Sequence, residues 1–447
     1  MPRLVVLGGG AAGMSAASAA KRVDPDLDVV VCEANGYAAY GMCGIPYYVG
    51  GIVARAEQLL AYPPDTFRAE RGIDLRLDTR AVELHPAEHR VVVESGGRRD
   101  VLPYDVLVLA AGARPTRPPI PGLDHERVFT VRSLEEAIRL RTLLDSGTVR
   151  RALVIGAGYI GLESAEALTE KGLDVDIAEA LPRPLTTVDE PLSALVEAEV
   201  RRHARLHLST AVTALRPAGT GLQVTLAGAG DLALDVDLVV LAAGVRPDSE
   251  LLVAAGAEHL PGGAIVVDRS MRTSLPDVYA AGDCVAHHHR VLDGPAWVPL
   301  GPAANKTGRV AGTVAAGGSA AFPGIVGTAV VKVFDLGVAR TGLTAGEAGD
   351  DALSTDVQHQ SRAKYYPGGH PMHVRLVHEP GGRLLGGQLA GRDGVAKRID
   401  ILATALYAGL GVADLAALDL SYAPPYAPVY DPILIAAQQA LRSRSLA

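Results

Sequence analysis

The stretch Leu4-Val5-Val6-Leu7-Gly8-Gly9-Gly10-Ala11-Ala12-Gly13 decides the fold of the N-terminal part of this chain. A short apolar strand runs directly into a G-x-G-x-x-G loop, and an alanine-rich helix follows to about Val23. In such a loop the first glycine makes a tight turn, the second lets a pyrophosphate approach the backbone, and the third allows the helix to pack on the strand. The pattern predicts a dinucleotide-binding unit whose phosphate contacts include Gly8, Gly10, Ala11, Ala12 and Gly13.

A second strand, Leu27 to Val31, ends at Cys32-Glu33, which places an acid twenty residues after Gly13. A carboxylate at this position accepts hydrogen bonds from ribose hydroxyls. Strand, loop, helix, strand and acid together favour an adenine dinucleotide over a purely structural glycine turn. Glu33 is therefore a predicted cofactor contact.

The same pattern returns in the middle of the chain. Ala152 to Ile155 is a strand, the loop Gly156-Ala157-Gly158-Tyr159-Ile160-Gly161 follows, and a helix from Leu162 to Lys171 precedes Glu179. Each half also closes alike, on Ala110-Ala111-Gly112-Ala113-Arg114-Pro115 and Ala242-Ala243-Gly244-Val245-Arg246-Pro247. This internal repeat of a whole domain implies two nucleotides, and a flavin with a nicotinamide is the natural pair for chemistry. It adds these predicted cofactor contacts: Gly156, Gly158, Tyr159, Ile160, Gly161, Glu179, Ala111, Gly112 and Gly244.

The segment Leu275 to Asp283 is a short strand that ends on Gly-Asp and completes the first domain. A carboxylate there would bind polyol hydroxyls rather than phosphate, which makes Asp283 a candidate for the ribityl chain. We expect an α/β protein with two Rossmann-like domains and a C-terminal α+β dimerisation domain. The expected boundaries are 1–118 with 244–323 for FAD, 119–243 for NAD(P)H and 324–447 for dimerisation, with linkers at 114–122 and 301–318.

The C-terminal part has no glycine fingerprint. We expect strands near 328–334, 372–377 and 384–390, and a helix from about Lys397 to Tyr407. Prolines interrupt residues 419–432 throughout, so this aromatic segment cannot be a helix. An ordered segment of this kind would suit a two-fold dimer interface.

Cys43 lies in Tyr40-Gly41-Met42-Cys43-Gly44-Ile45-Pro46, where a first helical turn would aim backbone N–H groups at the sulfur and lower the pKa of the thiol. The three cysteines lie far apart with no C-x-x-C pair, which argues against a disulfide framework, a zinc site and a local dithiol motif. We read Cys32 and Cys284 as small core residues. The run His287-His288-His289 is expected to form a solvated loop, and no metal site is predicted.

Composition excludes several functions. The chain of 447 residues has a net charge of -8 and scattered Lys and Arg, so nothing indicates nucleic-acid binding. No apolar run of about 18 residues could span a bilayer. The N-terminus leads straight into the first strand without a signal peptide, so the cytoplasm is the expected compartment.

Over essentially its full length the chain resembles the pyridine nucleotide-disulfide oxidoreductases, and within them the single-cysteine branch around coenzyme A-disulfide reductase. The resemblance rests on both fingerprints, the segment T-S-L-P-D-V-Y-A-A-G-D and Cys43. It implies an FAD-containing homodimer in which the C-terminal domain of one subunit covers the flavin of the other. In the oxidases and peroxidases a His assists the cysteine sulfenic acid, but the matching residue here is Ala11.

The resemblance also assigns further residues. A-K-Y-Y-P-G-G at 363–369 and S-Y-A-P-P-Y at 421–426 look like the two tyrosine segments of the coenzyme A-disulfide reductases, with Tyr365 and Tyr422 as catalytic residues beside Cys43. For Tyr366, Tyr426 and Tyr430 we favour ordinary half-buried packing. Tyr159 resembles a gate over the flavin and Glu163 a nicotinamide contact. The matching coenzyme A positions are Ser15, Arg22, Met42 and Arg71, although the usual S-F-x-x-C reads here as Ala39-Tyr40-Gly41-Met42-Cys43.

Glu179 favours NADH over NADPH, while Arg183 leaves NADPH open. The leading hypothesis is an NAD(P)H-dependent reductase of coenzyme A disulfide, persulfide or polysulfide that works through a mixed disulfide between Cys43 and coenzyme A. The alternatives are an NADH oxidase or peroxidase acting through a Cys43 sulfenic acid, and a non-catalytic flavoprotein sensor.

Overall fold

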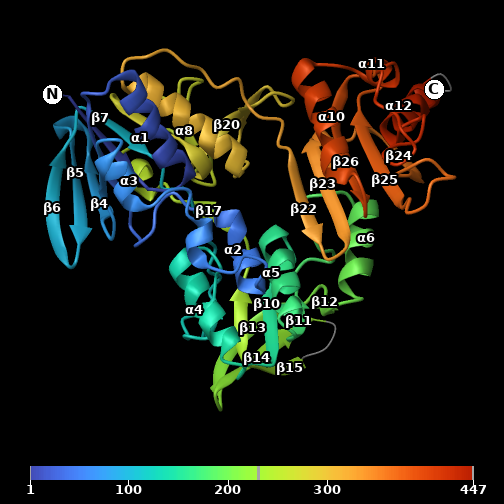
Figure 1. The fold of residues 1–447 in the computed structure, drawn as a ribbon, viewed down its shortest axis with the longest axis horizontal. Helices are drawn as coiled ribbons and strands as arrows, with labels where there is room; N and C mark the ends of the chain where they lie inside the picture. Colours follow the sequence, from blue (N-terminus) through green and yellow to red (C-terminus); the bar gives the residue numbers. More distant parts are fainter. Residues whose placement is uncertain (1, 229–231, 445–447) are drawn as a thin grey trace.

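The computed structural model describes residues 2–228 and 232–444 and contains two parallel sheets followed by an antiparallel one (Figure 1). The first parallel sheet has the order β19-β7-β1-β2-β3. Helix α1 (Ala11–Val23) follows β1 as predicted. The strands of this sheet are β1 (Arg3–Leu7), β2 (Asp28–Cys32), β3 (Ile73–Arg76), β7 (Val106–Leu109) and β19 (Val278–Ala280).

Helix α8 (Gly301–Ala315) packs against α1, so the linker expected at 301–318 is wrong. A Cβ added at Gly308 would lie 2.1 Å from the carbonyl oxygen of Ala12, and one at Gly312 would lie 2.0 Å from that of Ala16. These two glycines let the helix backbones touch. A composition of alanine and glycine therefore reflects close helix packing here, not chain flexibility.

The second parallel sheet repeats the first, with the order β12-β11-β10-β16-β9. In both halves, the strand before the glycine loop pairs with the strand that ends on Ala-Ala-Gly: Leu7 with Leu109, and Ile155 with Leu241. The strands are β9 (Val128–Phe129), β10 (Arg151–Ile155), β11 (Asp174–Ala178), β12 (Arg205–His207) and β16 (Leu238–Leu241), with helices α4 (Leu134–Asp145), α5 (Tyr159–Glu170) and α6 (Glu190–Val200).

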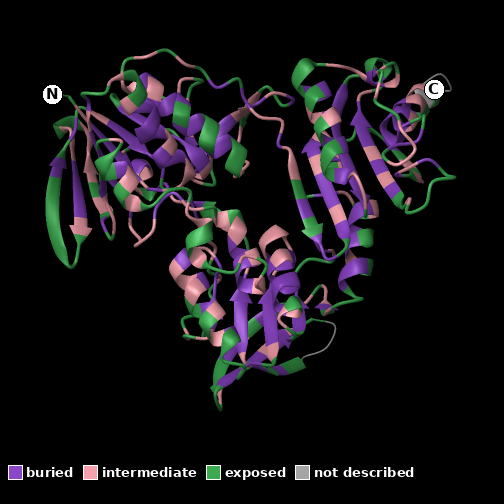
Figure 2. Ribbon diagram, in the orientation of Figure 1, coloured by how far each residue is buried: buried purple, intermediate pink, exposed green. Residues whose placement is uncertain are grey.

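Two smaller antiparallel sheets accompany the parallel ones. The first contains β4 (Arg80–His85), β5 (Arg90–Ser95) and β6 (Arg98–Pro103), and the second β13 (Ala211–Ala218), β14 (Gly221–Ala227) and β15 (Leu232–Val236). Figure 2 shows buried residues along β10 and β11, whereas the outer strand β6 is mostly exposed.

The two halves are joined at two places. Strand β8 (Ala113–Pro115) pairs antiparallel with β17 (Val245–Pro247). The segment that leaves the first half therefore lies beside the segment that returns to it. In addition, helix α2 (Ile45–Gly50), which follows Cys43, packs against α4 and α5, and its Ile45 and Val49 lie in the core of the second half. Cys43 is thus carried to the junction of the halves.

The C-terminal unit is an antiparallel sheet of order β22-β23-β26-β25-β24 with helices packed on it. Its elements are β22 (Ala329–Val333), β23 (Leu336–Gly342), β24 (Leu353–Gln360), β25 (Pro371–His378), β26 (Leu384–Gly391), α10 (Val395–Ala408), α11 (Val412–Ala416) and α12 (Pro432–Arg444). The three predicted strands and the predicted helix are confirmed. Residues 419–431 are irregular, as their prolines require.

The prediction of a solvated histidine loop is wrong. His287 to His289 belong to strand β20 (Val285–His289), which pairs with β18 (Ile265–Val266) and β21 (Gly294–Ala296). Strand alternation turns His287 and His289 inward, where both are buried. Burial lowers the pKa of His287 to about 4, so this imidazole is neutral at physiological pH.

In the described part of the chain, no helix is both long and apolar enough to cross a membrane.

Candidate functional site

In the first glycine loop, two glycines are required by the fold, and a third leaves room for a ligand. Gly8 has φ +108° and a Cβ there would lie 2.3 Å from the carbonyl oxygen of Ala110, while a Cβ at Gly13 would lie 1.8 Å from that of Gly8. Both glycines are therefore required by the fold. At Gly10, by contrast, a Cβ would meet nothing within 4 Å. This open space at the start of α1 is where a pyrophosphate can approach the backbone.

Glu33 follows strand β2 and bonds to this loop. Its carboxylate accepts hydrogen bonds from the backbone N–H of Gly9 at 2.7 Å and from the backbone and side chain of Asn35 at 2.9 and 2.7 Å. A carboxylate can accept about four hydrogen bonds, so one acceptor position remains for a ribose hydroxyl.

The second loop repeats this geometry. Gly156 has φ +102° with a Cβ position 2.4 Å from the carbonyl oxygen of Ala242, the Cβ position of Gly161 lies 2.0 Å from the carbonyl oxygen of Gly156, and Gly158 again faces open space. Glu179 accepts hydrogen bonds from Ala157 N at 2.7 Å and Leu181 N at 2.9 Å. Two acceptor positions remain, which matches a ribose with two free hydroxyls. Tyr159 and Ile160 open helix α5 and are half-buried.

Cys43 lies between these loops, in a short 3₁₀ turn (Met42–Gly44) ahead of α2. It is exposed, whereas Cys32 and Cys284 are buried, as predicted, and burial raises the pKa of these two thiols to about 11 and about 12. The expected lowering of the Cys43 pKa is wrong for the protein chain itself. Desolvation raises the pKa of Cys43, and the carboxylates of Glu163 and Asp283 raise it further.

Arg132 opposes this effect and was not recognised in the sequence. Its guanidinium lowers the pKa of Cys43 and pairs with Asp283 at 3.7 Å, while its Nε donates to the carbonyl of Ala113. The preceding residue, buried Val131, has φ +54°, a conformation that a β-branched residue rarely adopts. Strain of this kind often accompanies functional sites, but it is visible only in the structure, and the local sequence contains no signal for Arg132.

The remaining predicted cofactor residues lie after the ends of strands or at the start of α1. Ala111 and Gly112 follow β7, Gly244 follows β16, and Gly282 packs against Ala12 at the start of α1. Burial raises the pKa of Asp283 and Arg132 counteracts it. Ala11 and Ala12 form the first turn of α1. The chain thus brings together the residues of the first loop, Asp283 and Cys43.

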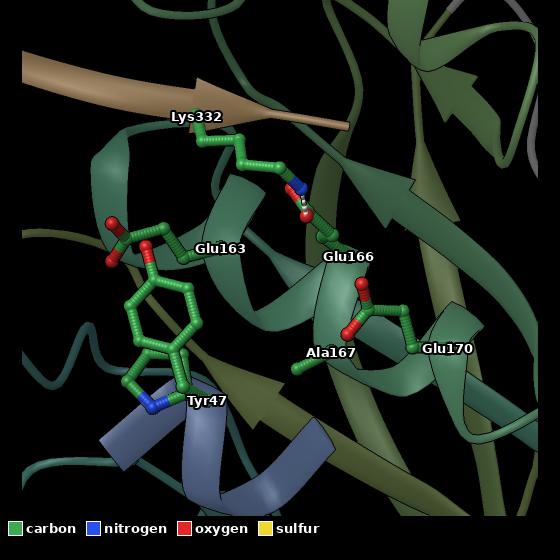
Figure 3. Close-up of a pocket in the computed structure, with 7 residues that line it drawn as sticks. Tyr47, Glu163, Glu166, Ala167, Glu170 and Lys332 are labelled. Atoms are coloured by element: carbon green, nitrogen blue, oxygen red, sulfur yellow. Dashed lines mark hydrogen bonds and ion pairs between the residues drawn. The ribbon is translucent and has the colours of Figure 1, made fainter. Parts of the chain in front are cut away.

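Glu163 lies on α5 beside a narrow pocket lined by Pro46, Tyr47, Glu163, Glu166, Ala167, Glu170 and Lys332. Burial, with a smaller contribution from Glu166, raises the pKa of Glu163 to about 7. Figure 3 shows the Tyr47 hydroxyl directed toward the Glu163 carboxylate, while Lys332 from β22 pairs with Glu166. Because the Glu163 carboxylate raises the pKa of Cys43, a carboxyl group that titrates near neutral pH acts on this thiol.

Of the predicted coenzyme A residues, Ser15 and Arg22 lie on α1, and Arg71 contacts the same helix at Ser18. Ser15 bonds to Asn305 of α8 at 3.0 Å, and Arg71 donates to Ser18 at 3.2 Å. Arg22 is exposed one turn after Ser18. The guanidinium of Arg71 also stacks over the rings of Tyr62 and Phe67. Asn305 was missed because its segment was interpreted as a linker. Met42 is half-buried beside Cys43.

Tyr365 and Tyr422 meet in the C-terminal unit, where their hydroxyl oxygens lie 2.9 Å apart. The hydrogen bond to Tyr365 raises the pKa of Tyr422. Both side chains are exposed. The half-buried packing expected of three neighbouring tyrosines is wrong for the single chain, since Tyr366, Tyr426 and Tyr430 are also exposed. An exposed cluster of aromatic residues is typical of an interface.

The chain belongs to the pyridine nucleotide-disulphide oxidoreductase family, whose model matches residues 2–311; the dimerisation domain of the same family matches residues 328–432. These matches agree with the two dinucleotide loops and the antiparallel C-terminal sheet described above.

Individual relatives point to sulfur chemistry and to oxygen chemistry. The NAD(P)H coenzyme A polysulfide/persulfide reductase of Pyrococcus horikoshii is 38% identical over 98% of both chains. The NADH oxidase of Methanocaldococcus jannaschii is 33% identical over 99% of both chains. The structure of a NAD-dependent persulfide reductase from A. fulgidus superposes with a TM-score of 0.94 at 40% identity, covering 99% of this chain and 83% of that one.

Proposed function

We propose that this protein is an FAD-dependent NAD(P)H:disulfide oxidoreductase that reduces coenzyme A disulfide, or the persulfide or polysulfide of coenzyme A. The observation that carries the proposal is the placement of its sulfur atoms. Cys43 is the one exposed cysteine of the three, and it lies where the two nucleotide-binding halves meet. Since no second protein thiol can pair with it, the second sulfur of the catalytic disulfide comes from the substrate.

The two glycine loops fit the two nucleotides. No contact within the chain explains the missing side chains at Gly10 and Gly158, so the open space there fits a ligand. Glu33 and Glu179 keep free hydrogen-bond acceptor positions for ribose. FAD is assigned to the first loop, with Asp283 on the ribityl chain, and NADH to the second. Bound FAD would supply two-electron transfer from NAD(P)H to a disulfide.

The residues of the chain then carry out the thiol chemistry. The Cys43 thiolate attacks coenzyme A disulfide, so that a Cys43–coenzyme A disulfide forms and one coenzyme A thiolate leaves. Two electrons from NADH cleave the new disulfide and regenerate the Cys43 thiolate with a second coenzyme A thiolate. Tyr365 and Tyr422 donate hydrogen bonds or protons to the departing sulfur, and Arg132 stabilises the Cys43 thiolate. Ser15, Arg22 and Arg71 bind the coenzyme A phosphates.

The protein acts as a homodimer in this proposal. In the single chain the tyrosine pair belongs to the C-terminal unit and is exposed to solvent. Two-fold association would place the pair of one subunit over Cys43 of the other and would cover the exposed aromatic cluster. A reducing compartment, the cytoplasm, suits an enzyme with an unpaired exposed thiol.

The test is the intact mass of the purified protein before and after treatment with a thiol reductant. We expect a coenzyme A-sized adduct that the reductant removes. The adduct should be absent from Cys43→Ser and present in Cys284→Ser, which alters a buried thiol. A wild-type protein without the adduct, and without turnover of coenzyme A disulfide, would refute the proposal.

The second candidate is an NADH oxidase, which the similarity to the M. jannaschii oxidase favours. Against it, Ala11 places no ionisable side chain at the start of α1. Oxygen consumption that depends on Cys43 and exceeds disulfide turnover would support the oxidase.

A further inference from the structure

The contact between Tyr365 and Tyr422 needs an anchor. Tyr365 lies between β24 and β25 and Tyr422 between α11 and α12, and their side chains are 75% and 45% exposed. Exposed side chains gain little from packing, so a hydroxyl–hydroxyl distance of 2.9 Å depends on how the two backbone segments are held.

Arg398, on helix α10, connects the two segments from the protein interior. Its Nη2 donates to the carbonyl of Ser361 at 2.9 Å, before Tyr365, and to the carbonyl of Tyr426 at 3.3 Å, after Tyr422. Its Nε donates to Asp431 Oδ2 at 2.7 Å. The residue is only 7% exposed. One planar guanidinium thereby bonds both tyrosine segments at once.

Two neighbours of Arg398, Gly394 and Asp431, fix the position of its guanidinium. Gly394 has φ +74°, where a side chain would be strained, and a Cβ there would lie 2.2 Å from Arg398 Nη1 and would displace the guanidinium. Asp431 is itself held, because its Oδ1 accepts the backbone N–H of Ile433 in the first turn of α12.

The two segments are also closed around this anchor. Ser361 N donates to the carbonyl of His370, which joins the two ends of the loop that carries Tyr365. Ala363 N donates to the carbonyl of Pro424 at 3.4 Å, so the two loops also contact each other directly. A displacement of Arg398 therefore affects both loops together.

We propose that Arg398 is the positioning residue for the Tyr365–Tyr422 pair, acting through the carbonyls of Ser361 and Tyr426. The inference rests on the proposed function for its catalytic consequence: with the pair in place, a phenol reaches the sulfur that leaves the mixed disulfide. Arg398 is buried and acts through the two loops that it bonds.

The variant Arg398→Lys tests this role, because lysine keeps the charge beside Asp431 but cannot reach both carbonyls with one planar group. Arg383→Lys is the matched control: this arginine of the same unit bonds Glu379 and the carbonyl of Val291 and neither tyrosine segment. Asp431→Asn serves as a second variant if Arg398→Lys folds poorly. All are studied as purified FAD-containing protein.

Three readouts are combined. We expect flavin reduction by NADH to be unchanged in Arg398→Lys, and reoxidation by coenzyme A disulfide to slow about tenfold. In a Tyr365→Phe/Tyr422→Phe background, Arg398→Lys should slow reoxidation less than twofold further. Amide hydrogen exchange should rise in 361–370 and 419–431 together, and remain unchanged in Arg383→Lys.

Each contrary result is specific. Equal slowing by Arg398→Lys in the tyrosine-free background, slower flavin reduction by NADH, or faster exchange in only one segment would overturn the inference. A wild-type enzyme that turns over neither coenzyme A disulfide nor the persulfide or polysulfide of coenzyme A would instead refute the proposed function, and the joint change in hydrogen exchange would still support Arg398 as the anchor of the pair.

Discussion

The variant Gly158→Ala tests nucleotide binding without disturbing the fold. A Cβ at Gly158 would meet no protein atom within 4 Å, and its backbone, with φ -83° and ψ -170°, suits any residue. We expect Gly158→Ala to fold normally, retain FAD and bind NADH poorly, since the new methyl group fills the space where the pyrophosphate approaches the helix N-terminus.

The magnitude follows from the bonds that are lost. A hydrogen bond to a charged group contributes about 1.5–3 kcal/mol. Loss of one such bond between backbone and phosphate raises the KM for NADH about 10- to 100-fold, because each 1.4 kcal/mol is a factor of about ten. The stability cost of Ala in place of Gly at this helix cap is at most about 1 kcal/mol.

Gly156→Ala is the control in the same loop. Its Cβ would lie 2.4 Å from the carbonyl oxygen of Ala242 and its φ is +102°, so we expect a loss of stability of about 2 kcal/mol or more. The assays are thermal unfolding, the KM for NADH, and flavin reduction by dithionite as a control for the FAD site. An unchanged KM in Gly158→Ala, or a fall in melting temperature as large as that of Gly156→Ala, would refute the reasoning.

Two further predictions concern charged groups. In Arg132→Gln the loss of the guanidinium should raise the pKa of Cys43 further, so that iodoacetamide alkylation at pH 7.5 slows severalfold and its pH midpoint moves upward; an unchanged midpoint would show that Arg132 does not stabilise the thiolate. In Asp176→Asn, the fully buried carboxylate that Arg205 and His207 bind is lost, which should cost about 3 kcal/mol in urea unfolding at pH 7. Since these partners hold the pKa of Asp176 below its ordinary value, the stabilisation is present above about pH 4 and lost as the pH falls through the folded-state pKa; a difference from wild type that persists at low pH would contradict this account.

The two glycine loops could be predicted from the sequence because their requirements are local. A tight turn at Gly8, a close approach at Gly13 and an acid at Glu33 act within one strand–helix–strand unit, so residue spacing carries the information. The repeat of this spacing at Gly156 identified the second half. The buried positions of Cys32 and Cys284 were predicted as well.

Other features depend on segments far apart in the chain. Helix α8 has the composition of a linker, and only its contact with α1 explains Gly308 and Gly312. The pKa of Cys43 depends on Glu163, Asp283 and Arg132, which come from three distant segments. Local sequence around Cys43 predicted the opposite direction, because it contains none of these charges.

Residue spacing alone predicted two dinucleotide-binding units and set Cys43 apart from two core cysteines, because fixed glycine spacing after short apolar runs encodes such units locally. The contacts between distant segments became visible only in the fold: Arg132 pairs with Asp283, Tyr365 bonds to Tyr422, and Arg398 bonds the two segments that carry these tyrosines. The physical reason is that hydrogen bonds and Coulomb interactions act over a few ångströms in space, whatever the separation of the residues along the chain.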